Sequence, residues 1–489
     1  MSIGALDFTI VLVYVLAMVA VGCYVGRGTT GAKDYLLGSR NLPWWALLLS
    51  IVATETSTVT FLSTPGLAYG GGLKGTLGDF RFLQLPIGYL IGRLVVVRWL
   101  LPLYFRGEVF TAYQVLSERF GGAVRKLASL LFLVTRTLAD GLRLFLTALV
   151  VQEMLHIPLE VAVALMGAVT IVYTYFGGMK AVVWTDVLQF VVYMAGAVVA
   201  LLVLLGGLPG GLSDLTELAT RPERSRLFDF GFALNNPYTF WAGLVGGAVL
   251  SIGSHGVDQM IVQRYLAAKS QSEAGLALSL SGVVVLLQFA FFLVLGVGLA
   301  AFYVHHAPAK EFEHSDKVFL DFIVHHTPIG VKGLVIGAVF SAAMSTLSSS
   351  LNSSAAALVN DIVLPLRGLP PEHPSGLGLA KGATLLFGGL QIAVGASGLG
   401  LGDEAVVNQV LGIAALTTGL LLGIYALGTA TSRVRQGHAV FGLSCGLAVD
   451  LVLKFASSLA WPWYSVVGSV TTFVCGLVAA VVRPTRNTA

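Results

Sequence analysis

Apolar runs of membrane-spanning length recur along the whole sequence, and this feature limits the fold more than any other. Only 11% of the 489 residues are charged, whereas soluble proteins usually carry about 25%. A bilayer core about 30 Å thick is crossed by about 20 apolar residues in a helix, and lipid cannot satisfy the backbone of an irregular span. The sequence therefore predicts an all-α membrane protein.

Breaks between the apolar runs, at charged residues and at Gly or Pro, predict about thirteen transmembrane helices. The expected ranges are 5–26, 43–70, 79–104, 122–154, 158–177, 184–206, 238–263, 276–304, 328–363, 378–398, 404–430, 436–455 and 460–483. The shorter amphipathic segment 108–119 is expected at the membrane interface. Because no Lys or Arg precedes the first run and its core is long, we expect it to remain as a helix and not to act as a signal peptide.

Lys and Arg in the short loops predict the orientation of the bundle. Arg27, Lys33 and Arg40 follow the first expected helix, and Arg433 and Arg435 follow the eleventh. Loops of this kind all fall on one side, so we expect the amino terminus outside and the carboxyl terminus in the cytoplasm. The protein is expected to cross the cell (inner) membrane many times and to work as a monomer, with the lipid bilayer as its surroundings.

Net charge and motifs limit the partners of the chain. The formal net charge is only +4, and no block of like charges predicts a nucleic-acid partner. The sequence contains no GxxxxGK[ST] phosphate loop, which is the motif that cradles nucleotide phosphates. We therefore expect any active transport to use an ion gradient.

Residues 50–66 (SIVATETSTVTFLSTPG) interrupt an apolar run with many Ser and Thr, with Glu55 and with Pro65. Such a segment predicts a broken helix whose freed carbonyl groups lie beside protein or a watery cavity. A kinked packing helix, whose hydroxyls bond to the preceding turn, is the alternative. Glu55 favours the functional interpretation, because a charge at the centre of a membrane helix costs about 2.5–3.5 kcal/mol.

The expected helix at 328–363 has a polar face. At about 100° per residue, Ala342, Ser345, Ser349 and Asn352 fall within one arc of the segment GAVFSAAMSTLSSSLNSSAAALVND. Hydroxyl and carbonyl oxygens are the ligands that hard cations prefer. Small polar residues also mediate close helix packing in membranes, so the residues alone leave both interpretations open.

Two more segments contain polar residues within apolar surroundings. In YTYFGGMKAVVWTDVLQ (173–189), Gly177 and Gly178 permit a tight turn, and Asp186 requires a partner or a place near a helix end. The segment HGVDQMIVQRYLAAKSQSEA (255–274) ends a helix with basic residues.

The combination of GGMKAVVWTD, VQRYLAAKSQSEA and MSTLSSSLNSS resembles the solute:sodium symporter family, with motifs most similar to bacterial sialic acid and monocarboxylate carriers. The resemblance covers about residues 5–480. It implies a leucine-transporter fold with inverted repeats at 43–206 and 207–430, an extra helix and loop at 1–42, and two more helices and a tail at 431–489. It also implies that the protein is not an enzyme but a sodium-coupled symporter that imports a small organic solute by alternating access.

The same resemblance implies which residues bind sodium ions. The main site matches the carbonyl groups of Ala53, Thr56 and Ala342 and the hydroxyls of Ser345 and Thr346. Some members hold a second sodium ion, and its ligands correspond to Asp186, Ser345, Ser348 and Ser349. All of these residues supply oxygen atoms, so the sequence leaves one or two sodium ions per cycle open.

For the solute pocket, the resemblance implies two facing sets of residues: Glu55, Ser57 and Thr60, and opposite them Ser251, Ser254 and His255. Thr60 stands where sugar carriers have a glutamine, which argues against sugar transport. Arg136 and Arg143 each lie about one helical turn from the position of the carboxylate-binding arginine of sialic acid carriers, and neither falls on it. Arg136, Asp140 and Arg143 could instead form an internal charge ladder along one helix.

Three alternatives to sodium symport stay open from the sequence. A proton-coupled symporter would use Glu55 or Asp186 as its titrating carboxylate. A channel or a sensor could have kept the same fold. The identity of the solute also stays open.

Overall fold

The computed structural model describes residues 4–27, 31–70, 73, 76–106, 109–308, 311–397 and 406–482. Within these ranges the secondary structure is helical, and the single β-type contact is a bridge between Leu42 and Ala268. The predicted all-α class is therefore confirmed. The expected loop around 399–403 and the last residues of the carboxyl-terminal tail lie outside the described part of the chain.

The first half of the chain forms α1 (Ala5–Val25), α2 (Ala32–Leu37), α3 (Trp44–Glu55), α4 (Thr58–Tyr69), α5 (Gln84–Val95), α6 (Leu101–Tyr104), α7 (Gln114–Phe120), α8 (Gly122–Leu155), α9 (Leu159–Gly206) and α10 (Leu212–Thr220). The second half forms α11 (Gly247–Gly256), α12 (Gln259–Leu266), α13 (Gln271–His305), α14 (Asp316–Asp321), α15 (Val331–Ala357), α16 (Leu364–Leu366), α17 (Gly376–Ala396), α18 (Val406–Ala430), α19 (Gln436–Ala456) and α20 (Pro462–Val482).

By length and composition, nine of the described helices can cross a membrane, or ten if the bent pair α3 and α4 is one span. Helix α9 has 48 residues, and about 20 are enough to cross a bilayer. It covers both expected helices at 158–177 and 184–206. The charge-bearing helix α8 and the pair α11 and α12 are not among those counted, so the number thirteen stays a prediction.

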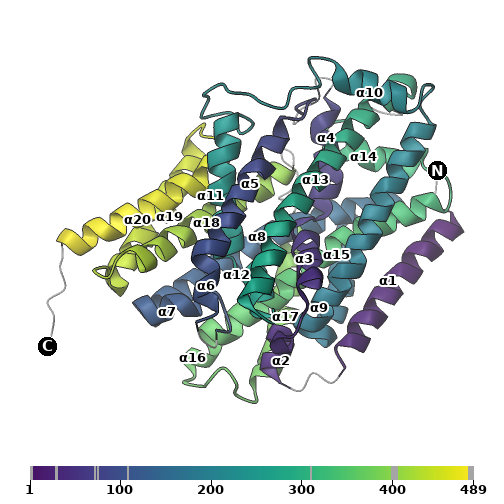
Figure 1. The fold of residues 1–489 in the computed structure, drawn as a ribbon. Coiled ribbons are helices and arrows are strands. Elements are labelled where there is room, and N and C mark those ends of the chain that lie inside the picture. Colours follow the sequence, from purple (N-terminus) through teal and green to yellow (C-terminus); the bar gives the residue numbers. More distant parts are fainter. Residues whose placement is uncertain are drawn as a thin grey trace, which may run out of the picture.

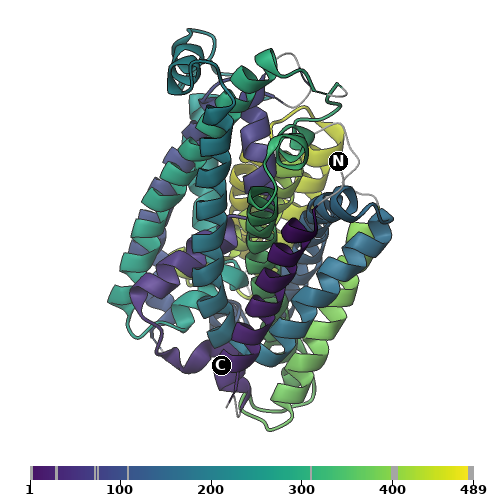
Figure 2. The same ribbon diagram turned by 90° about the vertical axis from the view of Figure 1, so that its right-hand side faces the viewer.

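Figures 1 and 2 show a bundle of long helices that lie roughly side by side. Helix α1 runs along one side against α9 and α15, and the pair α19 and α20 packs against α18 at the opposite edge. The short helices α10 and α14 lie at one end of the bundle, and α2, α7 and α16 lie at the other. The first helix is tied to the core by Asp7, whose Oδ1 accepts hydrogen bonds from the N–H groups of Gly330 (2.7 Å) and Gly333 (2.8 Å) at the start of α15.

Helix α15 forms the centre of the bundle, and nearly all of its side chains are buried. Its many Ser, Ala and Gly residues allow neighbouring helices to approach closely. The same kind of approach brings α13 against α4, because a Cβ atom on Gly296 would lie 2.1 Å from the carbonyl oxygen of Pro65. Small residues therefore hold the broken segment α3–α4 between α13 and α15.

Gly178 divides α9 into two parts. Its dihedral angles, φ 61° and ψ −170°, lie outside the helical region and in a region that is essentially restricted to glycine. The turn packs on α2, where a Cβ atom at this position would lie 2.7 Å from the carbonyl oxygen of Tyr35. The predicted turn at Gly177 and Gly178 is confirmed.

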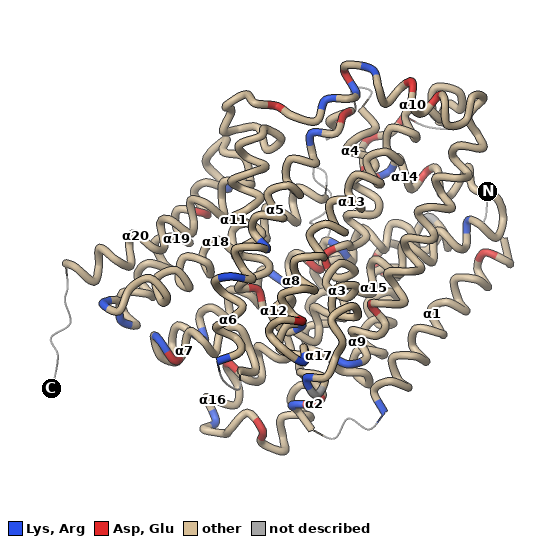
Figure 3. The backbone as a smooth tube through the Cα atoms, viewed as in Figure 1, with Lys and Arg blue, Asp and Glu red and all other residues tan. Residues whose placement is uncertain are grey.

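Charged residues occupy two kinds of location. Figure 3 shows many of them near the two ends of the bundle and a smaller group inside it. Buried members of the inner group are Arg93, Asp140, Asp186, Asp258 and Arg264. Because an unpaired charge is costly away from water, the partners of these residues indicate where the functional site lies.

Candidate functional site

The break between α3 and α4 is the first component of the site. Helix α3 ends at Glu55, α4 begins at Thr58, and the two helices are bent by 61°. Thr56 and Ser57 join them in extended conformations (φ −85°, ψ 98° and φ −100°, ψ 179°). A helix that ends in this way leaves its last carbonyl groups free for other partners. The predicted broken helix is therefore present.

Two hydroxyls of α15 face these carbonyl groups. Ser345 Oγ donates to the carbonyl oxygen of Ala53 at 2.9 Å, and Thr346 Oγ1 donates to that of Thr54 at 3.0 Å. Both hydroxyls also lie near the carbonyl oxygen of Ala342, at 3.2 and 3.5 Å. All five residues are buried. Four of the five residues predicted for the main sodium site thus meet, together with Thr54, which the sequence reasoning missed.

Thr56, the fifth predicted residue of that site, has a side chain that points elsewhere. Its hydroxyl donates to Gln288 Oε1 on α13 at 3.0 Å. The resemblance assigned only the carbonyl group of Thr56 to the ion. The side-chain contact therefore leaves that assignment untested, and it ties the break to α13.

Asp186, from the second part of α9, lies between α3 and α12. Its Oδ2 accepts hydrogen bonds from Ser50 Oγ at 2.5 Å and from Arg264 Nη2 at 2.9 Å. Ser348 and Ser349, the other residues expected at a second sodium site, donate to the carbonyl oxygen of Ser345 at 3.2 and 2.7 Å. Arg264 belongs to the motif VQRYLAAKSQSEA but was interpreted only as a basic helix end.

Glu55 contacts an arginine and a histidine from two other helices. It accepts a hydrogen bond from Arg93 Nη2 on α5, and its Oε2 lies 3.5 Å from His255 Nε2 on α11. Arg93 Nη1 also donates to Ser281 Oγ on α13 at 3.0 Å, and Ser254 Oγ lies 2.9 Å from His255 Nδ1. The structure thus brings Glu55, Ser254 and His255 together as expected. Arg93 was missed, although an arginine inside the apolar run 79–104 was a signal.

The remaining residues expected at the solute pocket lie on α11 and at the start of α4. Ser251 Oγ donates to the carbonyl oxygen of Tyr89 on α5 at 3.1 Å. Ser57 and Thr60 are buried. Between them Thr58 Oγ1 lies 2.8 Å from Thr147 Oγ1 of α8. Helix α4 therefore turns one face toward α8, while Glu55 points toward α5 and α11.

A chain of four charged side chains connects α8 to the break between α11 and α12. Arg143 donates to Asp140, Arg136 Nε lies 3.9 Å from Asp140 Oδ2, and Arg136 Nη2 donates to Asp258 Oδ2 at 2.6 Å. Asp258 also caps α12, because its Oδ1 accepts from the N–H of Met260 at 2.8 Å. Arg143 is thus part of the internal ladder that the sequence offered as its alternative role, and the ladder continues to a second broken helix.

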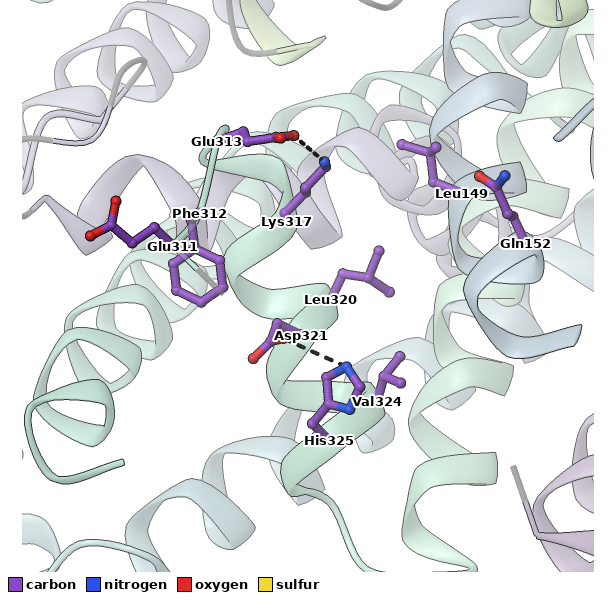
Figure 4. Close-up of a pocket in the computed structure, with 10 residues that line it drawn as sticks. All are labelled: Leu149, Gln152, Glu311, Phe312, Glu313, Lys317, Leu320, Asp321, Val324 and His325. Atoms are coloured by element: carbon purple, nitrogen blue, oxygen red, sulfur yellow. Dashed lines mark hydrogen bonds and ion pairs between the residues drawn. The ribbon is translucent and has the colours of Figure 1, made fainter. Parts of the chain in front are cut away.

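Two of the cavities that border α8 differ in size and in lining. A space of about 20 Å³, large enough for about one water molecule, adjoins the charge chain and is lined by Thr135, Arg136, Ala139, Arg143, Asp258, Ile413, Ala414, Thr417 and Thr418. A cavity of about 550 Å³ opens between the end of α8 and the α14 segment (Figure 4). Its polar contacts include the pairs Glu313–Lys317 (2.6 Å) and Asp321–His325 (3.7 Å). None of the predicted site residues lines this larger cavity.

The chemistry of the buried groups suits a hard monovalent cation. The described residues contain no group of three or more His, Cys, Asp or Glu side chains placed to hold a metal ion. The break instead presents carbonyl and hydroxyl oxygens, which are ligands for hard cations. Freed carbonyls at broken helices coordinate Na⁺ or H⁺ in many secondary transporters.

Comparisons with known proteins agree with a binding site for a hard cation. The model of the sodium:solute symporter family matches residues 35–373. The chain is 28% identical to the sodium/sialic acid symporter SiaT of Proteus mirabilis, over 98% of this chain and 95% of that protein. It is 31% identical to the human sodium/iodide cotransporter (94% and 71% covered) and 30% identical to the sodium-coupled monocarboxylate transporter 1 of Xenopus laevis (93% and 73% covered).

The fold has solved counterparts as well. A Na⁺-coupled sialic acid symporter in a substrate-bound, outward-open state superposes with a TM-score of 0.87 at 27% identity, over 98% of each chain. The predicted leucine-transporter fold and the resemblance are therefore confirmed. The chain belongs to the sodium:solute symporter family, and it is a multi-pass, sodium-coupled membrane transporter and not an enzyme.

Proposed function

We propose that the main sodium ion binds where α15 meets the break between α3 and α4. Its ligands are the carbonyl oxygens of Ala53, Thr56 and Ala342 and the hydroxyl oxygens of Ser345 and Thr346. The observation that carries this proposal is the pair of α15 hydroxyls that bond the carbonyl groups of Ala53 and Thr54. These short contacts bring oxygen atoms from two helices into one buried position, and the hydroxyl protons can rotate away when a cation enters.

A sodium ion at this position would couple binding to conformation. It would hold the broken segment α3–α4 against α15, and the solute would then bind to an arrangement that the ion has already stabilised. Linkage requires the solute to raise the affinity for sodium by the same factor. Proton coupling is less well supported, because both candidate carboxylates have a guanidinium partner: Glu55 bonds to Arg93 and Asp186 bonds to Arg264.

We infer that the solute is a small anion that binds between the breaks and α8. Three relatives carry, by name, sialic acid, iodide and a monocarboxylate, all of which are anions at neutral pH. Arg136 and Arg143 lie beside the small cavity, together with Thr417 and Thr418 of α18. Guanidinium groups bind carboxylates through charge-assisted hydrogen bonds. An anionic solute would compete with Asp140 and Asp258 for these two arginines.

We also propose that residues 43–206 and 207–430 are the two inverted repeats. Each range contains a helix that is interrupted near its middle: α3 and α4 in the first range, and α11 and α12 in the second. In carriers with such repeats, broken helices at equivalent positions form the binding site. Both interrupted helices contact the charge chain or the helix that carries it: Asp258 caps α12, and Thr58 of α4 lies 2.8 Å from Thr147 of α8.

Uptake into proteoliposomes tests the sodium site. Replacing Ser345 and Thr346 together with Ala removes both side-chain ligands, so the sodium concentration for half-maximal solute uptake should rise at least fivefold, or transport should stop. Ser353→Ala is the matched control, because among the described residues its hydroxyl bonds only within α15, to the carbonyl oxygen of Ser350 at 3.0 Å. An unchanged sodium dependence in the double variant would contradict the site.

A further inference from the structure

Arg264 occupies the region that the second sodium ion would need. Its Nη2 bonds Asp186 Oδ2 at 2.9 Å and Ser349 Oγ at 2.5 Å, and it also bonds Thr54 Oγ1. Its Nε bonds Ser50 Oγ at 2.9 Å. Arg264 and Asp186 are both almost completely buried, with side-chain exposures of 1% and 0%. One nitrogen atom thus bridges two of the four predicted ligands of that ion.

A sodium ion and this nitrogen cannot bridge Asp186 and Ser349 at the same time. Nη2 lies within 3 Å of both oxygens, in the space that an ion bound to both of them would need. Electrostatics adds to the exclusion, because a second positive charge beside a buried pair would lack a counter-charge and like charges repel strongly in a poorly polarisable interior. Asp186 nevertheless keeps one buried carboxylate oxygen, Oδ1, that accepts no hydrogen bond from any described residue.

We propose that Arg264 is a tethered cation that alternates with the second sodium ion at Asp186. In the sodium-free site its guanidinium neutralises Asp186, and binding of the second ion displaces it. This inference rests on the proposed function, because it assumes that the chain binds sodium at the α15 site. It adds a residue that sets how tightly, and in which state, the second ion binds.

The position of Arg264 links this exchange to helix movement. The residue lies on α12, the short helix after the break at Val257, and its Nη1 also bonds the carbonyl oxygen of Met260 in the same helix at 2.6 Å. Its bonds to Asp186 and Ser349 fasten α12 to α9 and α15. When sodium takes the place of the guanidinium, α12 loses these contacts. The second ion therefore releases α12, whereas the main ion fastens α3 to α15.

Equilibrium binding of radiolabelled sodium to the purified protein, at constant ionic strength, tests the exchange. In Arg264→Gln no tethered cation competes with sodium for Asp186, so this variant should bind the second sodium ion at least tenfold more tightly than the wild type. The double variant Asp186→Asn/Arg264→Gln should bind one ion only. The melting temperature of Arg264→Gln should accordingly rise more steeply with sodium than that of the wild type.

A second arginine, Arg125, pairs with a buried aspartate while its own side chain is 13% exposed, and it provides the matched control. Arg125 Nε bonds Asp361 Oδ1 at 2.6 Å, and Asp361 also accepts from Thr111 (2.5 Å) and Ser129 (2.7 Å), yet no predicted sodium ligand lies in this cluster. Arg125→Gln should lower the melting temperature without changing the sodium isotherm. If Arg264→Gln does not fold, Arg264→Lys is used in its place. A single ammonium group cannot reproduce the several bonds of the guanidinium, so it should compete less well, and the affinity for the second ion should be at least threefold higher than in the wild type.

The outcomes separate the two proposals. A wild type that binds no sodium would contradict the proposed sodium sites themselves. Sodium binding in the wild type, with an unchanged isotherm in the Arg264 variants, would overturn only the exchange. Loss of the second ion in Arg264→Gln would overturn it as well, because Arg264 would then support the site and not compete for it.

Discussion

Glu55 illustrates how a single charged residue is accommodated inside the bundle. Its carboxylate lies between Arg93 of α5 and His255 of α11, and its side chain is 17% exposed. Neutralising one member of a buried ion pair is costly, because the remaining charge keeps its desolvation penalty without its partner. The contacts therefore favour a role in which Glu55 joins α3 to its neighbouring helices.

Replacing Glu55 tests this role. Glu55→Gln leaves Arg93 without a counter-charge, so the variant should lose about 3–5 kcal/mol of stability. Glu55→Gln combined with Arg93→Gln should recover much of that loss, since neither charge then remains. Melting temperature and solute affinity should be measured on the same preparation. A stable Glu55→Gln variant with selectively weakened solute binding would show instead that the carboxylate contacts the solute.

In helix α9, the geometry at one residue sets the direction of a whole helical segment. Its two parts are joined at Gly178, where the turn packs on α2 and the Tyr35 hydroxyl donates to the carbonyl oxygen of Thr174 at 3.0 Å. The second part carries Asp186, so the angle at this turn positions the carboxylate against α3 and α12. Backbone geometry at one glycine is therefore coupled to the proposed second ion site.

Gly178→Ala should destabilise the protein by at least about 2 kcal/mol, because the strained dihedral angles alone cost about 1–3 kcal/mol and the new Cβ atom would meet Tyr35. Gly382→Ala in α17 is the control, since a Cβ atom added at this glycine would have no neighbouring atom within 4 Å among the described residues. That variant should be neutral or gain about 0.5–1 kcal/mol, as Ala does over Gly in a helix. Equal melting temperatures for the two variants would contradict the role of Gly178.

At the scale of the whole molecule, the open question is which end of the bundle faces the cytoplasm. Ser213 lies on α10 at one end, and Ser432 lies in the connection between α18 and α19, beside Arg433 and Arg435. Both serines are exposed. Because basic loops stay on the cytoplasmic side, we expect Ser213 outside and Ser432 inside.

Cysteine labelling in intact cells tests this orientation. In a background without Cys23, Cys445 and Cys475, a membrane-impermeant maleimide should label Ser213→Cys directly. Ser432→Cys should react only after the cells are permeabilised. The unsubstituted cysteine-free protein is the control for background labelling. The reverse pattern would invert the predicted topology.

The sequence by itself determined the features that depend on local order along the chain. Apolar runs predicted the helices, and most observed ends lie within a few residues of the expected ones, such as 122–154 against Gly122–Leu155. The break near Glu55 and the turn at Gly178 were also predicted, because Ser, Thr and Gly act on the backbone beside them. The polar arc of α15 followed from helical periodicity alone.

The tertiary structure decided which charged groups meet. Glu55 pairs with Arg93, Arg136 with Asp258, and Asp186 with Arg264, and each pair joins residues far apart in the sequence. Periodicity gives the face of a helix on which a side chain lies, but the neighbour on that face depends on how the helices pack. Lipid offers these charges no alternative partner, so the packing of the bundle fixes each pairing, and with it the place of Arg264 among the predicted ligands of sodium.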